Sequence, residues 1–217
     1  MTDTGTQPDI RAVIFDLGGG VLVNMDSAPL KEKLYVNLNP DEIGEPERHF
    51  LRNPIMVSFN RGQTTPEEFF RRTCERYRLD LDFETFKDLW CDMFWTMDGM
   101  EELVGRVSKK ATIGLLSDTD PLHWNYIRTT WPWINRIKKP TLSFEVGVMK
   151  PDAAIYLAAS ENVRTPPPQC LFIDDLQANV DGARAAGMRA IRFENRDSLA
   201  RDLAISGLLE LAGHQGA

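Results

Sequence analysis

The sequence predicts an α/β fold in which a mostly parallel sheet lies between two layers of helices and a helical insertion follows the first strand. Short, continuous apolar runs at residues 12–15, 113–116 and 171–173 are typical of strands that are buried on both faces. Helical patterns alternate with such runs in the second half of the chain, as in strand–helix–strand units. Residues 25–98 interrupt this alternation, because they read as helical and free of strands.

The first apolar run leads into one carboxylate and three consecutive glycines. Residues 12–15 end at Asp16, and Gly18, Gly19 and Gly20 follow after one leucine. Glycine allows the main chain to approach a ligand and to adopt conformations that other residues avoid. We therefore expect Asp16 at the carboxyl edge of the sheet, with its oxygens free to attack a substrate or to bind a metal. The alternative is a strand that ends in a turn capped by Asp16.

The insertion contains two well-marked helices. Thr65, Pro66 and Glu68 form the start of the first, with threonine as the N-cap and proline at the first position. The inward face of this helix is predicted to comprise Phe70, Cys74 and Tyr77. Asp82 is predicted to cap the second helix. The apolar residues at helical spacing in the second helix, expected to form a core, are Phe86, Leu89, Trp90, Met93 and Phe94.

The second half of the chain alternates as the fold class requires. Pro151 can begin a helix that turns Ile155 and Ala159 inward, and a helix over residues 179–186 stops at Gly187. Apolar runs follow these helices, so the strands are expected to be mostly parallel and covered on both faces.

Reactive side chains stand at the ends of the strand-like runs in this half. In chain order they are Ser117 with Asp118, Lys150, and Asp174 with Asp175. The apolar segment before the lysine, residues 146–149, is read as a strand like the others. Together with Asp16 these residues supply a nucleophile, a hydroxyl, a cation and carboxylates at one edge of the sheet. This set suits phosphoryl transfer, which depends on positioning and on neutralising charge.

Four motifs in this order resemble those of the haloacid dehalogenase-like hydrolase superfamily. They are Phe-Asp-Leu-Gly-Gly at 15–19, Leu-Leu-Ser-Asp-Thr at 115–119, Gly-Val-Met-Lys-Pro-Asp at 147–152, and Phe-Ile-Asp-Asp at 172–175 followed by Asn179. Residues 143–156 are especially similar to a branch that includes bacterial sugar-phosphate phosphatases and the phosphatase domain of soluble epoxide hydrolases. The resemblance implies a Rossmann-like catalytic core formed by residues 10–24 and 99–217. Residues 25–98 would form a small helical cap that closes over the active site.

The resemblance also implies a role for each motif residue. Asp16 would attack phosphorus and form an aspartyl-phosphate that water then hydrolyses. Ser117 and the main-chain N–H of Asp118 would bind the phosphoryl oxygens. Lys150 would offset the charge of the phosphoryl group and orient Asp16. The structural alternative for Lys150 is an ordinary surface lysine.

Magnesium is the expected cofactor, because the predicted site offers carboxylate and carbonyl oxygens and no cluster of His or Cys. By the resemblance its ligands would be a carboxylate oxygen of Asp16, the carbonyl of Gly18 and the side chain of Asp175. Asp174 would lie just outside this ligand set. The alternative for Asp174 and Asp175 is a pair of solvated turn carboxylates.

The sequence departs from the usual motifs at two positions. Many phosphatases of the superfamily carry a second aspartate, a general acid and base, two residues after the nucleophile, where this chain has Gly18. The branch that this chain resembles often has glycine there too, although the run of three glycines is one longer than usual. The second departure is Asp118, since asparagine is more usual after the Ser or Thr.

Composition narrows the class of protein and its partners. A chain of 217 residues suffices for one sizeable domain with a smaller insertion. The net charge of −7 argues against nucleic acid or an anionic membrane as the main partner. No run approaches about 18 apolar residues, and residues 1–9 are unlike a signal peptide. The three cysteines show no paired metal spacing, so we expect a cytoplasmic protein with reduced thiols. Monomer and homodimer are both compatible with the sequence.

These observations favour a Mg²⁺-dependent phosphomonoester hydrolase acting on a small cytosolic metabolite such as a sugar phosphate. One alternative is a haloacid dehalogenase, which also uses an aspartate nucleophile but needs no metal, so the Asp174–Asp175 pair argues against it. Another is a catalytically weak binding or regulatory protein that keeps the fold and has lost turnover through Gly18 and Asp118.

Overall fold

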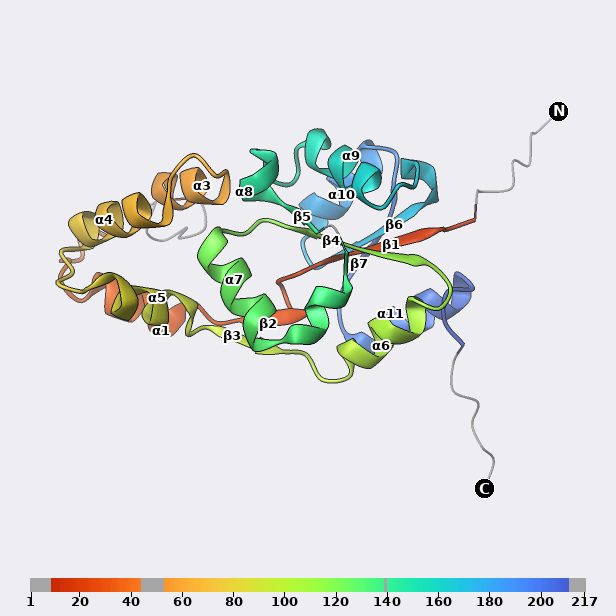
Figure 1. Ribbon diagram of the computed structural model, residues 1–217, viewed down its shortest axis with the longest axis horizontal. Helices are drawn as coiled ribbons and strands as arrows, with labels where there is room; N and C mark the ends of the chain where they lie inside the picture. Colours follow the sequence, from red (N-terminus) through yellow and green to blue (C-terminus); the bar gives the residue numbers. More distant parts are fainter. Residues whose placement is uncertain (1–8, 44–52, 139, 211–217) are drawn as a thin grey trace, which may run out of the picture.

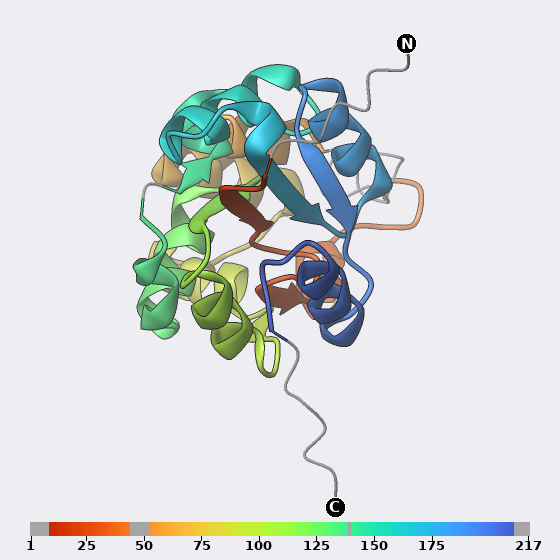
Figure 2. The ribbon, with the colours of Figure 1, turned by 90° about the vertical axis from the view of Figure 1, so that its right-hand side faces the viewer.

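The computed structural model describes residues 9–43, 53–138 and 140–210, so most of the stretch 1–9 lies outside the described residues. Within them, five parallel strands form one sheet in the order β5–β4–β1–β6–β7 (Figures 1 and 2). Their bounds are β1 Ala12–Asp16, β4 Thr112–Ser117, β5 Thr141–Leu142, β6 Cys170–Asp174 and β7 Arg189–Arg192. The predicted α/β class with a Rossmann-like parallel sheet is confirmed.

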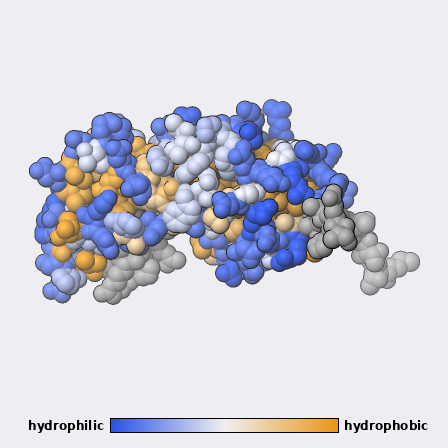
Figure 3. Space-filling view, turned by 90° about the horizontal axis from the view of Figure 1, so that it is seen from below, coloured by the Kyte–Doolittle hydropathy of each residue, from blue (hydrophilic) through white to orange (hydrophobic). Residues whose placement is uncertain are grey.

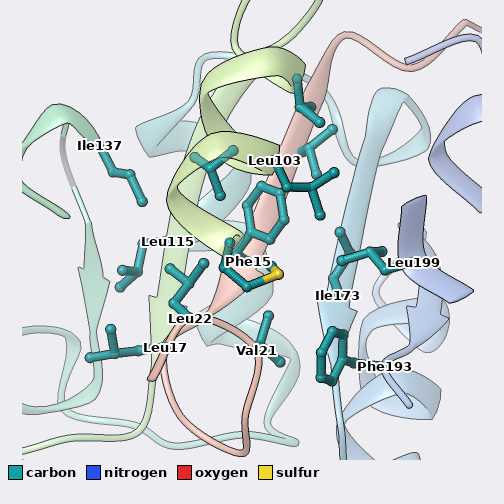
Figure 4. Close-up of a cluster of buried hydrophobic side chains, with 14 of the residues drawn as sticks. Phe15, Leu17, Val21, Leu22, Leu103, Leu115, Ile137, Ile173, Phe193 and Leu199 are labelled. Carbon is teal, nitrogen blue, oxygen red and sulfur yellow. The ribbon is translucent and has the colours of Figure 1, made fainter. Parts of the chain in front are cut away.

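Helices cover both faces of the sheet. They are α6 Met100–Val107 and α11 Arg196–Ile205 on one face, and α9 Ala153–Asn162 and α10 Gln177–Ala185 on the other. Side chains of a strand point alternately to its two faces, so Phe15 packs in the cluster with Leu103 and Leu199 (Figure 4). Ile14 packs in the opposite cluster with Ile155. Burial on both faces explains why these strands read as continuous apolar runs.

Four helices occupy the described part of residues 25–98. They are α1 Ala28–Tyr35, α3 Pro54–Asn60, α4 Pro66–Tyr77 and α5 Phe83–Cys91. Both predicted N-caps are confirmed, because Thr65 Oγ1 accepts the N–H of Glu68 and Asp82 Oδ1 accepts the N–H of Thr85. These helices share a separate hydrophobic cluster, which includes Phe59, Phe69, Phe86 and Trp90.

The predicted inward face of α4 is displaced by one residue. Phe69 and Thr73 are buried, whereas Phe70 and Cys74 are only partly buried, and Tyr77 is buried as expected. Phe69 instead faces α3, where its ring stacks on that of a phenylalanine with ring centroids 4.0 Å apart.

The expectation that residues 25–98 contain no strand is wrong. Strand β3, Phe94–Thr96, pairs antiparallel with β2, Val23–Met25. The predicted second helix therefore ends early: α5 stops at Cys91, and Met93 and Phe94 lie beyond it. The pairing joins segments that lie far apart in the sequence, and a local helical pattern does not reveal such a partner.

The apolar segment before Lys150 is also not a strand. The short helix α8, Ser143–Val146, ends at Gly147, whose φ of +86° stops the helix. The edge strand at this place is the two-residue β5, so the chain has already left the sheet before it reaches the lysine. The remaining elements are helix α7 Pro121–Thr130 and the 3-10 helices η2 Pro132–Arg136 and η3 Pro167–Gln169.

All three cysteines are free thiols inside the fold. Burial raises the pKa of Cys91 to about 12 and the pKa of Cys170 to about 11, which makes both thiols unreactive. None of the described helices combines the length and apolar character needed to cross a bilayer.

Candidate active site

The predicted site residues meet at the carboxyl edge of the sheet. Asp16, Ser117 and Asp174 are the last residues of β1, β4 and β6, three adjacent parallel strands. Asp175 follows β6 directly, and Lys150 arrives from the loop after α8. The parallel sheet brings the strand ends together, as the sequence predicts.

Lys150 bridges two of the carboxylates. Its Nζ lies 2.7 Å from Asp16 Oδ1 and 2.7 Å from Asp174 Oδ2, and its side chain is 4% exposed. Lys150 is therefore not a surface lysine. Since Oδ1 of Asp16 is held in this way, its Oδ2 is the atom without a hydrogen-bond donor among the described residues.

Asp174 is saturated with donors. Its Oδ1 accepts the main-chain N–H of Leu176 at 2.9 Å, and the side-chain amide of Asn179 reaches Oδ1 and Oδ2 at 3.0 and 3.1 Å. With Lys150 on Oδ2, this carboxylate is fixed in place and turned inward. Asn179, a part of the motif to which the sequence assigned no role, stands on the first turn of α10 and orients Asp174.

Asp175 is the less constrained carboxylate of the pair, and it lies against the glycine turn. A Cβ on Gly19 would stand only 2.0 Å from Asp175 Oδ1, and Gly19 has a φ of +60°. The positive φ favours glycine at position 19, and a larger residue would also have to displace the Asp175 carboxylate. Oxygens of Asp16, Asp174 and Asp175 lie within 4.8 Å of one another, a spacing that a metal ion can bridge. The carbonyl of Gly18 accepts the N–H of Val21 at 3.0 Å and keeps a second lone pair free.

Burial and crowding of like charges shape the electrostatics of this cluster. Burial raises the pKa of Asp16 to about 7, against the lowering effect of Lys150. Burial also raises the pKa of Asp175, and the nearby charge of Asp174 adds to the increase. Burial alone would lower the pKa of Lys150, but the carboxylates around it outweigh burial and raise it. The lysine therefore stays protonated, whereas Asp16 and Asp175 are less readily ionised than free aspartates, because one lysine does not balance several buried carboxylates.

Asp118 holds the loop that carries the lysine. Its Oδ1 accepts the main-chain N–H of Lys150 at 3.0 Å, and burial raises its pKa. Ser117, beside it, is buried. The Oγ atom of Ser143 accepts the N–H of Thr119 at 3.0 Å and ties α8 to the same loop. An asparagine at position 118 could accept the same bond, so aspartate differs by one additional negative charge.

Gly18 differs from the two glycines after it. Gly19 and Gly20 have positive φ, whereas Gly18 does not. The nearest atom to a Cβ built on Gly18 is Asp16 Oδ2, at 4.0 Å. The loop therefore has room for a side chain at this position.

A separate hollow of about 980 Å³ lies on the helices of residues 25–98, outside the carboxylate cluster. Helices α1 and α5 line it, together with Tyr126 of α7. Helices α1 and α5 lie at the left-hand end of the molecule in Figure 1, and Figure 3 shows several apolar residues at the surface of that end. None of the predicted site residues lines this hollow.

The parallel sheet, the paired carboxylates and the buried lysine define an α/β protein with a polar, charged site at the ends of adjacent strands. The chain belongs to the haloacid dehalogenase-like hydrolase family, whose model matches residues 10–187. This finding confirms the resemblance of the four motifs, and it makes the protein an enzyme of that family.

Three curated relatives indicate the range of the family. Flavin mononucleotide hydrolase 1 of Arabidopsis thaliana is 30% identical over 172 residues, which cover 78% of this chain and 70% of the relative. D-ribitol-5-phosphate phosphatase of Bacteroides thetaiotaomicron is 22% identical, with 90% and 98% covered. Drimenol cyclase drtB of Aspergillus calidoustus is 28% identical, but the match covers 89% of this chain and only 36% of that protein.

Solved structures of the family share the fold. A HAD family enzyme of Bacteroides thetaiotaomicron, crystallised with magnesium and inorganic phosphate, superposes with a TM-score of 0.76 at 24% identity. The match covers 88% of this chain and 98% of that one. The phosphatases among these relatives support a phosphatase-like hydrolase.

Proposed function

We propose that this protein is a Mg²⁺-dependent phosphomonoester hydrolase that acts on a small phosphorylated metabolite through an aspartyl-phosphate. The observation that carries the proposal is the bridge from Lys150 to Asp16 and Asp174, with Asp175 beside it. A dehalogenase needs no metal and gains nothing from the pair Asp174 and Asp175 beside the nucleophile. For this reason the phosphatase is preferred.

The donor set fits magnesium. Carboxylate oxygens of Asp16 and Asp175, with the carbonyl of Gly18, are hard oxygen ligands of the kind that this ion prefers. Asp174 already accepts hydrogen bonds from Leu176 and Asn179, so its proposed role is to hold Lys150 beside the metal ligands rather than to bind the ion. When bound, the ion would supply positive charge between the nucleophile and the phosphoryl group.

The chain's own residues account for the covalent steps. An oxygen of Asp16 attacks phosphorus, the bond from phosphorus to the ester oxygen breaks, and the leaving oxygen takes a proton. Water then attacks the aspartyl-phosphate, which releases inorganic phosphate and regenerates the carboxylate. Lys150 holds Asp16 in position and offsets negative charge, and the hydroxyl of Ser117 is proposed to bind a phosphoryl oxygen. Residues 25–98 are proposed to act as a cap that excludes water.

Names of two relatives suggest the substrate. Flavin mononucleotide and D-ribitol 5-phosphate both carry phosphate on the terminal carbon of a ribityl chain. We propose terminal phosphates of such linear polyols as the substrate class.

The test is phosphate release by the purified protein from flavin mononucleotide, D-ribitol 5-phosphate and p-nitrophenyl phosphate. Hydrolysis is expected with Mg²⁺ and is expected to disappear with excess chelator, returning when Mg²⁺ is restored. Full activity in chelator would contradict the metal assignment. Release of chloride from 2-chloropropionate without phosphate release would instead identify a dehalogenase.

Gly18 gives a prediction about the leaving group. Without a carboxylate at this position, the leaving oxygen must take its proton from water or from the substrate, so aryl phosphates should react much faster than alkyl phosphates. Gly18→Asp, for which the loop has room, is expected to narrow this difference about tenfold or more. The measurement is kcat for p-nitrophenyl phosphate and for a polyol phosphate.

Gly18→Asn is the matched control, because it has the same size without an ionisable acid. If both variants show the same ratio of rates as the parent protein, another residue already supplies the proton.

A further inference from the structure

The helices of residues 25–98 touch the core at a tight turn beside the active site. Helix α3 ends at Asn60, and the turn that follows contains Arg61 and Gly62. A Cβ on Gly62 would stand 2.0 Å from the carbonyl oxygen of Phe144, and its φ is +65°. Figure 1 shows α3 next to α8, the short helix that contains Phe144. Glycine at position 62 therefore allows the turn to press directly against the core.

This turn lies close to the loop that contains Asp118. Ser143 Oγ, one residue before Phe144, is hydrogen-bonded to both main-chain groups of Thr119, at 3.0 and 3.1 Å. The positive charge of Arg61 acts on Asp118, where it opposes the rise in pKa caused by burial. Among the arginines of α3, α4 and the turns at their ends, Arg61 is the one whose charge affects the pKa of Asp118.

The Arg61 side chain is free to bind something else. It is exposed, and its guanidinium makes no hydrogen bond or ion pair with any other described residue. By contrast, Arg71 on α4 pairs with Glu68 and Glu75. Asn60, next to Arg61, is only 6% exposed, and its Oδ1 has no hydrogen-bond donor in the described part of the chain. The turn therefore contains a buried polar group that the described residues leave unpaired, beside the exposed Arg61.

The charge balance of the site calls for another cation. Four aspartates, at positions 16, 118, 174 and 175, face one lysine, and a phosphomonoester brings up to two more negative charges. With all four carboxylates ionised, the complex would remain negative even when a divalent cation is bound. An arginine suits this need, because its planar group donates two parallel hydrogen bonds to phosphate oxygens.

We propose that Arg61 is a substrate-binding residue, contributed by the turn after α3, whose guanidinium binds the phosphoryl group of the bound phosphomonoester beside Asp118. The inference rests on the proposed function. It assigns to the inserted segment a direct contact with the reacting group, in addition to the exclusion of water.

The test compares Arg61→Ala, Arg61→Lys and, as a matched control, Arg71→Ala, which removes an exposed arginine from α4. With Mg²⁺ present, Arg61→Ala is expected to lower kcat/KM for p-nitrophenyl phosphate by about 10- to 100-fold. Competitive inhibition by inorganic phosphate is expected to weaken by a similar factor. Arg61→Lys should recover part of the loss, and Arg71→Ala should stay within about twofold of the parent protein.

Calorimetric titration with inorganic phosphate and Mg²⁺ separates the two proposals. If the parent protein does not hydrolyse phosphomonoesters but binds phosphate, and Arg61→Ala loses that binding, the proposed function fails and the assignment of Arg61 stands. If the parent protein is active and Arg61→Ala matches it in both kcat/KM and phosphate inhibition, the assignment of Arg61 is overturned alone. A parent protein that neither hydrolyses nor binds phosphate overturns both.

Discussion

Asp16→Asn is expected to abolish hydrolysis, with kcat reduced by at least about a thousandfold. The amide has almost the same shape as the carboxylate, but it is a poor nucleophile and a weaker metal ligand. It also replaces the anion that Lys150 contacts at 2.7 Å, so the nucleophile and its orientation are lost together. The measurement is phosphate release under saturating Mg²⁺ with the best substrate.

The control for this variant is Asp181→Asn, the same chemical change on an exposed aspartate of α10 that pairs with Arg184. This control is expected to keep full activity. Thermal unfolding should show that Asp16→Asn remains folded, because Asp174 continues to pair with Lys150. Retention of more than a tenth of the parent activity by a folded Asp16→Asn would exclude Asp16 as the nucleophile.

Lys150→Ala is expected to lower kcat by about a hundredfold or more, because it removes the charge that faces the developing negative charge in the transition state. It also leaves two buried carboxylates without their cation. Loss of one partner of a buried pair destabilises a protein by about 3–5 kcal/mol. The prediction is measured by steady-state kinetics together with chemical denaturation in Mg²⁺ and in chelator.

Lys150→Arg separates the two effects, since it keeps the charge but changes its geometry. We expect it to recover stability more than activity, because the enclosed site has little room for the larger group. A loss below threefold in Lys150→Ala would show that the lysine does not act on the reacting group.

The sheet and the meeting of most candidate site residues were predictable from the sequence, because both depend on local patterns. Strands buried on two faces must be apolar throughout, so β1, β4 and β6 stand out, and the residues at their ends are brought together by parallel packing alone. The positions of Asp16, Ser117 and Asp174 follow from that rule. The N-caps at Thr65 and Asp82 are equally local, since each depends on a side chain three residues from its partner.

The features that the sequence did not reveal depend on contacts between distant residues. Strand β3 is defined by its pairing with β2 rather than by its own composition. Lys150 lies 134 residues from Asp16 along the chain, so a sequence pattern could suggest their meeting but could not show that one ammonium would bridge two carboxylates. The role proposed for Arg61 has the same limit, because in the sequence it resembles any exposed arginine, and only the structure shows Gly62 against Phe144.

The antiparallel pair β2–β3 determines how the inserted helices are joined to the sheet. The chain leaves the core through Val23–Met25 and returns through Phe94–Thr96, and these two connections are hydrogen-bonded to each other over three residue pairs. A two-stranded ribbon is stiffer than two independent linkers. We therefore expect the inserted helices to move as one rigid body, with bending at the ends of β2 and β3. One end of that ribbon is anchored at the glycine turn, where the N–H of Gly20 donates to the carbonyl of Val23. A movement of the helices would therefore reach the glycine turn after Asp16 first, and we expect it to change the shape of the turn that is proposed to hold the metal.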